Sequence, residues 1–154
     1  MQAPSTGVVG SQLTGATNQY LTDMTTEKKQ SERRDTLIFG TPKNWDNDRN
    51  GIWKFDGISN ETLTILLSEE LIDPNESQNN SPTVGEIKEF LDNHEGFLAH
   101  GYVVSPYRND SRVSLEGVTK SGEIDKDDVI AFYEMFRFAD EITAHEKCLH
   151  CWYD

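Results

Sequence analysis

The chain has 154 residues, of which 27 are acidic and 14 are basic, and its formal net charge is −13. This length is typical of one domain that buries a core without disulfides or a structural metal. An anionic surface repels phosphate backbones and anionic lipids, so we expect no direct contact with nucleic acid or membranes. The sequence shows neither an apolar run of roughly 18 residues, as a membrane-spanning helix requires, nor a secretory signal. With only two cysteines, these features predict a cytoplasmic protein.

Residues 1–34 are rich in small and polar side chains, and their apolar residues follow no period. This composition is typical of a disordered segment. We therefore predict a disordered N-terminal tail over residues 1–34 and a single α+β domain over residues 35–154. The predicted domain holds 10 basic and 24 acidic side chains, so the excess of negative charge lies in the folded part.

The first predicted elements are two strands and a helix. Residues 36–39 and 51–55 are β-prone runs, separated by a Pro/Asn/Asp-rich stretch that ends in an Asn-Gly step, which favours a turn. They predict a first β-hairpin with a long loop. Leucines at helical spacing then predict a helix over residues 59–72, with Ser59 or Asn60 as its N-cap.

The middle of the chain predicts a helix and a second hairpin. Thr83 is followed three residues later by Glu86, the capping-box pattern of a helix start, and apolar residues at helical spacing come next. Segments 97–104 and 112–118 alternate between apolar and polar residues. Two such segments joined by a short polar loop predict an antiparallel pair.

The end of the chain predicts the main core helix and a terminal strand. Asp125 can cap a helix whose apolar residues fall at helical spacing. These residues are Val129, Phe132, Tyr133, Phe136 and Ala139. The apolar segment 148–153 would be buried best as a strand of the sheet. The predicted order is therefore β-β-α-α-β-β-α-β. It indicates an α+β fold with a mostly antiparallel sheet and about three helices on one face.

One loop resembles half of a calcium site. Asp46, Asp48 and Asn50 are oxygen donors at alternate positions, as in the first half of an EF-hand loop. The bidentate Glu that completes such a loop is missing, and Asp56 lies one place early. We expect an Asx-rich turn and no cofactor. A calcium-binding module that uses these four residues remains an alternative function.

The two cysteines form a Cys-x-x-Cys pair at Cys148 and Cys151. One pair supplies only two of the four ligands of a structural zinc site. In a strand, residues three apart point to opposite faces and cannot share a metal. A redox dithiol would need a helix N-terminus after the cysteines to activate the thiolate, and only three residues follow. We therefore expect buried structural cysteines.

A possible catalytic group lies in the second hairpin. If Val103 pairs with Val113, His100 faces Glu116, and a histidine beside a carboxylate can act as a general base. Arg112 is the third candidate. The sequence contains none of the common nucleophile or phosphate-binding motifs. A hydrolase-type enzyme centred on His100 is therefore an alternative, and a non-catalytic protein is favoured.

The acidic surface predicts a basic partner. Glu86, Glu89 and Asp92 share one face of the helix that follows Thr83, and they are the candidate partner-binding residues. In size, charge and lack of catalytic motifs, the chain resembles small acidic bacterial inhibitor and immunity proteins. The resemblance is one of composition, and it implies binding without catalysis. We expect a non-catalytic interaction protein that docks a basic macromolecule, most simply a basic protein.

Overall fold

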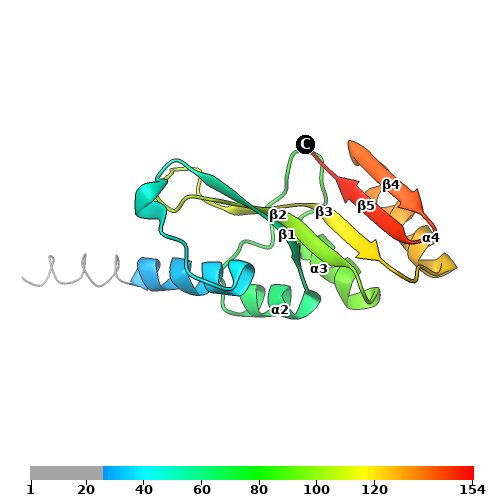
Figure 1. Ribbon diagram of the computed structural model, residues 1–154, viewed down its shortest axis with the longest axis horizontal. Coiled ribbons are helices and arrows are strands. Elements are labelled where there is room, and N and C mark those ends of the chain that lie inside the picture. Colours follow the sequence, from blue (N-terminus) through cyan, green and yellow to red (C-terminus); the bar gives the residue numbers. More distant parts are fainter. Residues whose placement is uncertain (1–25) are drawn as a thin grey trace, which may run out of the picture.

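The computed structural model describes residues 26–154 and has an α+β fold (Figure 1). One five-stranded sheet has the order β1-β2-β3-β5-β4, and every neighbouring pair is antiparallel. The strands are β1 (Ile52–Ile58), β2 (Leu98–Val104), β3 (Val113–Ser121), β4 (Glu141–His145) and β5 (Cys148–Trp152). The helices are a helix over residues 26–39, the 3-10 helix η1 (Trp45–Asn47), α2 (Asn60–Ser68), α3 (Val84–Asn93) and α4 (Lys126–Phe136). The predicted fold class is confirmed.

The core lies between the sheet and the helices. Leu63, Leu66 and Ile87 are fully buried where α2 and α3 pack on each other and on the sheet. An aromatic group extends the core to α4, since Phe90 lies 5.0 Å from Phe136 between ring centroids, and Phe136 is fully buried. No helix in residues 26–154 combines the length and the apolar character that crossing a membrane requires.

The predicted helix starts are confirmed. The Ser59 side chain accepts a hydrogen bond from the Thr62 amide at the start of α2. The reciprocal capping box is present at Thr83 before α3, and a second one is present at Asp125 before α4. These caps satisfy backbone amides that would otherwise have no partner in the first helical turn.

The β2–β3 hairpin is also confirmed, with one change of register. Val103 pairs with Val113 as predicted, but a bulge after His100 places that residue opposite Gly117. A β-bulge leaves one residue of the pair without a direct partner, and here that residue is Glu116. Gly117 is required there because a Cβ atom would lie 2.0 Å from the Cys151 carbonyl oxygen.

The prediction for the first hairpin is wrong. Residues 36–39 are the end of the helix that the structure describes from residue 26, and β1 pairs with β2 instead. Residues 26–34 are therefore helical, although the sequence predicted that they belong to a disordered tail. The rest of the predicted tail, residues 1–25, lies outside the described residues. The buried side of this helix includes Arg34 and Asp35. Because Arg34 and Asp35 occupy buried positions, the apolar residues of this segment do not repeat at the helical spacing by which a helix is recognised.

Two further differences concern the end of the chain. Strand β4 was not predicted, and it forms a hairpin with the predicted terminal strand β5. On α4, Phe132 and Phe136 are buried as predicted, whereas Val129 and Tyr133 are 37% and 41% exposed. The apolar stripe of α4 is thus wider than the surface that the core covers.

Candidate functional site

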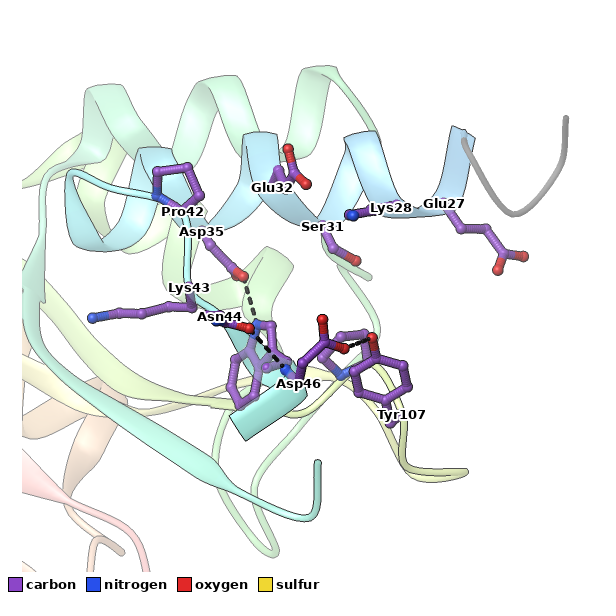
Figure 2. A pocket seen from close by; sticks show the side chains of 12 residues that line it. Glu27, Lys28, Ser31, Glu32, Asp35, Pro42, Lys43, Asn44, Asp46 and Tyr107 are labelled. Atoms are coloured by element: carbon purple, nitrogen blue, oxygen red, sulfur yellow. Dashed lines mark hydrogen bonds between the residues drawn. The ribbon is translucent and has the colours of Figure 1, made fainter. Parts of the chain in front are cut away.

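An open groove of about 710 Å³ lies at the end of the molecule that carries the first helix (Figures 1 and 2). Its walls are one side of the helix over residues 27–35, the segment 42–46 and the residues Pro106 and Tyr107 of the β2–β3 loop. We call it the acidic groove.

Local contacts hold the two walls of the groove in place. The helix ends at Gly40, whose φ of 81° is a left-handed conformation that glycine adopts without strain. The Asn44 side chain then caps η1 by accepting a hydrogen bond from the Asp46 amide. The β2–β3 loop is tied to the start of β1, since the Ser105 amide donates to the Gly51 carbonyl across 3.0 Å.

The floor of the groove is a buried polar contact. The Trp45 indole Nε1 donates to Asp35 Oδ2 across 2.7 Å, and Arg34 Nε donates to Asp35 Oδ1 across 3.0 Å. Trp45 is 5% exposed and Asp35 is 1% exposed. A buried carboxylate needs such donors, because removing it from water without them would be costly.

Negative charge dominates the lining of the groove. In Figure 2, Asp35 and Ser31 extend from the helix toward the opposite loop, and Asp46 extends from that loop toward the helix. Glu27 and Glu32 are exposed at the rim. Asp46 is exposed, and because a carboxylate has about four acceptor positions, Asp46 can accept bonds beyond those it already makes.

The lining also contains Lys28 and Lys43. The Lys43 Nζ lies 4.2 Å from the Trp53 ring centroid and 4.7 Å from that of Phe39. Figure 2 shows that this side chain extends away from Asp46 and Tyr107. Its charge is therefore directed to the aromatic faces outside the groove, an arrangement that cation–π attraction favours.

Tyr107 forms an aromatic corner of the groove that already holds a guanidinium group. Its hydroxyl donates to Asp46 Oδ1, and this hydrogen bond, with burial and the Asp46 charge, raises the pKa of Tyr107. The Arg49 guanidinium lies 4.4 Å from the Tyr107 ring centroid and 3.7 Å from Asp46 Oδ1. A cation over an aromatic ring beside a carboxylate is a favourable arrangement.

The predicted calcium ligands do not converge. Asp46 faces Tyr107, whereas Asp48 Oδ2 accepts from the Trp53 indole across 3.1 Å. The Asn50 carbonyl accepts from Arg108, and Asp56 lies on β1. No group of three or more His, Cys, Asp or Glu side chains within residues 26–154 could hold a metal ion.

The structure places His100 in a buried position beside β5. Its Nε2 lies 3.0 Å from the Cys151 carbonyl oxygen, and its ring stacks on that of His150 at 4.9 Å between centroids. His100 is 8% exposed. Burial, followed by the nearby His150, lowers the pKa of His100, although the Cys151 carbonyl and Glu116 oppose that shift.

The other two catalytic candidates have separate partners. Glu116 is 5% exposed, accepts from the Trp152 indole across 2.9 Å and lies 3.6 Å from Lys54 Nζ. Arg112 donates to the Tyr102 hydroxyl across 3.0 Å and lies 3.3 Å from Glu76. Arg112 lines a second recess, of about 560 Å³, which neither His100 nor Glu116 lines.

The predicted partner-binding residues are all exposed on α3, but two of them have intramolecular roles. Glu86 accepts from the Thr83 amide in the capping box. Asp92 accepts from Asn60 across 3.0 Å and from Lys88, and these hydrogen bonds lower the pKa of Asp92. Glu89 is exposed between them.

Cys148 and Cys151 are both free thiols. Cys151 is buried and points into the core, whereas Cys148 is half-buried. Burial raises the pKa of the Cys151 thiol to about 12. A thiol with so high a pKa is unreactive at neutral pH.

Comparison of this chain with protein-family models, curated proteins and solved structures found no match. The groove is therefore interpreted from its own residues. Sequence reasoning named Asp46 for another purpose and missed Asp35, Trp45 and Tyr107. The sequence signal for this helix is the spacing of Ser31, Asp35 and Ile38, which places them on one face. This face is recognised as the buried side of a helix only if a carboxylate is accepted as a buried residue.

Proposed function

We propose that this chain is a non-catalytic interaction protein that docks a basic protein partner in the acidic groove. The observation that carries the proposal is the combination of inward-facing carboxylates with an aromatic floor and corner in one recess. A basic side chain inserted there would meet the exposed Asp46 carboxylate as an acceptor and the exposed Tyr107 ring as an apolar contact surface, above the buried floor of Asp35 and Trp45.

The charge distribution of the whole chain supports a basic partner. Within residues 26–154, eight of the 14 basic side chains form ion pairs with carboxylates of the same chain. Residues 26–154 also carry 26 acidic side chains. Most of these carboxylates therefore form no ion pair with a basic side chain of residues 26–154. A surface of this kind attracts a cationic protein over a distance and speeds its association.

Exposed aromatic residues next to the groove support a protein partner rather than a free ion. Tyr107 is 52% exposed in the groove wall, and Trp53, whose ring lies 6.3 Å from that of Trp45, is 39% exposed. Aromatic side chains surrounded by charged groups are typical of the residues that contribute most to protein interfaces.

In this proposal the protein acts in the cytoplasm, where free cysteines remain reduced, and in a role like that of bacterial inhibitor and immunity proteins. Binding would depend strongly on salt, because exposed charges are screened at high ionic strength. The calcium-binding and hydrolase alternatives remain predictions. The four calcium candidates do not converge on one point, and His100, Glu116 and Arg112 do not share one recess.

A peptide titration tests the proposal directly. The probes are a labelled arginine decapeptide, a lysine decapeptide and a glutamate decapeptide, titrated into the full chain at low and moderate salt. The critical variant is Ser31→Lys, which places a cation between the two walls of the groove. Its matched control is Ser77→Lys, which makes the same change of charge at an exposed loop position outside the groove.

We expect the basic peptides to bind and the acidic peptide not to bind. Ser31→Lys should weaken binding about tenfold or more, and Ser77→Lys less than about threefold, because charges beyond one Debye length are screened. Equal effects of the two variants would overturn the groove as the docking site. Absence of binding by both basic peptides to the wild-type chain would overturn the basic partner itself.

A further inference from the structure

Strand β4 forms the end of the sheet farthest from the acidic groove (Figure 1). It pairs with β5 along one edge, and its other edge pairs with no strand of residues 26–154. Four of its five residues are exposed. Its pairing with β5 is regular over all five residues, without a bulge. A regular, uncovered edge strand is a template for pairing with another strand.

Exposed apolar residues also lie on and just after α4, the helix that contacts β5. On and just after α4, Val129 is 37%, Ile130 is 47%, Tyr133 is 41% and Phe138 is 76% exposed. Phe138 is the most exposed of the large apolar residues in the described chain. A group of apolar side chains of this size on a protein surface commonly marks an interaction site.

The register shows that β4 extends the apolar surface. Ile142 pairs with Cys151 and Ala144 pairs with Leu149, both of which point into the core. Ile142 and Ala144 therefore face the side of the sheet on which α4 lies, and Ala144 is exposed there. A strand added beside β4 would cover these residues and bring its own helix toward the apolar face of α4.

The sequence of β4 is suited to pairing with itself. In an antiparallel pair of two copies centred on Thr143, Glu141 of each copy faces His145 of the other, and Ile142 faces Ala144. Glu141, Thr143 and His145 share the opposite face from Ile142. The pairing thus places a carboxylate beside an imidazole on one face of the sheet and two apolar side chains beside each other on the other face. Cross-strand pairs of both kinds stabilise a sheet.

We propose that β4 pairs with β4 of a second copy of this chain, which joins two five-stranded sheets about a two-fold axis at Thr143. A two-fold interface must be complementary to itself, and the Glu141 and His145 arrangement meets that requirement. The dimer goes beyond the proposed function, because the first helix, which lines the acidic groove, lies at the end of the molecule opposite β4 (Figure 1), so the dimer would leave both grooves open.

The net charge of −13 on each chain makes the dimer sensitive to salt. Two strongly anionic bodies repel each other at low ionic strength, and added salt screens that repulsion. The apolar contacts are not weakened by moderate salt. We therefore expect the dimer to become more stable as salt rises from low to moderate concentration, whereas binding in the groove becomes weaker.

Sedimentation velocity of the full chain tests the proposal over a wide range of protein concentration at two salt concentrations. The critical variant is Thr143→Lys, which places two lysines face to face across the two-fold axis at a position exposed in the single chain. The matched control is Thr64→Lys on the exposed side of α2. A second variant, Phe138→Ser, removes the most exposed apolar side chain without adding charge.

We expect the wild-type chain to form a dimer as concentration rises, with a dissociation constant that Thr143→Lys raises at least tenfold and Thr64→Lys changes less than threefold. Phe138→Ser should also weaken the dimer. A wild-type chain that stays monomeric at the highest concentration, or dimers that Thr143→Lys leaves unaffected, would overturn the proposal. Ser31→Lys should leave the dimer unchanged, so the failure of one proposal can be told from the failure of the other.

Discussion

Trp45 donates a hydrogen bond to Asp35 across 2.7 Å, and this contact joins the first described helix to the segment that leads into β1. Both side chains are almost completely buried. The same contact closes the floor of the acidic groove. The stability of this end of the fold and the shape of the groove therefore depend on one buried pair.

Replacement of Trp45 by phenylalanine should lower the free energy of unfolding by about 2 to 4 kcal/mol. A hydrogen bond to a charged group contributes about 1.5 to 3 kcal/mol, and the smaller ring leaves unfilled volume. Urea unfolding followed by circular dichroism measures the change. Trp53→Phe is the matched control, because Trp53 donates to Asp48 across 3.1 Å but is 39% exposed. Similar losses in both variants would contradict a special role for the buried pair.

The aromatic core should be far less tolerant than the exposed side of the same helix. Phe136 is fully buried, whereas Val129 is 37% exposed. Phe136→Ala should lower the free energy of unfolding by about 3 to 5 kcal/mol, the usual effect of emptying a buried aromatic site. Val129→Ala should lower it by less than about 1 kcal/mol in the single chain. A loss below about 1 kcal/mol for Phe136→Ala would show that the orientation of α4 is wrong.

Much of the fold could be predicted because its signals are local. The caps at Ser59, Thr83 and Asp125 depend on a side chain and an amide a few residues apart, so the sequence contains the whole motif. The β2–β3 pairing followed from alternation within two adjacent segments. These features need no knowledge of the rest of the chain.

The missed features depend on distant residues. Asp35 can occupy the buried side of a helix only because the Trp45 indole and the Arg34 guanidinium donate hydrogen bonds to its two oxygens. Strand β4 is mostly exposed, and it becomes a strand through pairing with β5 rather than through its own composition. The groove needed both the helix and the β2–β3 loop that carries Tyr107, and no sequence pattern links those two segments.

Stability should depend on pH through His100. Burial, then the charge of His150, lowers the pKa of this histidine from its ordinary value of 6.5. The unfolded chain therefore binds a proton more readily than the folded chain below pH 6.5. Stability is complete above this pH and decreases as the pH falls through the window between the ordinary and the lowered pKa.

Urea unfolding at intervals from pH 7.5 to pH 5.5 would measure this dependence. His100→Gln removes the titrating group but can still donate to the Cys151 carbonyl, so the variant should show a flatter profile. Ser77→Gln is the control, because Ser77 is an exposed loop residue without a titrating group and its replacement should leave the profile unchanged. If His100→Gln kept the wild-type slope, the dependence would have to arise from another group.

The two cysteines should react at very different rates although they are three residues apart. Cys151 is fully buried, and its pKa is raised to about 12, whereas Cys148 is half-buried on the other face of β5. Because the thiolate is the reactive form, iodoacetamide at pH 8 should modify Cys148 of the native chain and leave Cys151 unmodified. Peptide mass mapping measures the ratio, and unfolding in urea should make both thiols reactive. Equal rates in the native chain would mean that β5 separates easily from β3, and the Cys151 carbonyl contact that holds His100 would then be lost at the same time.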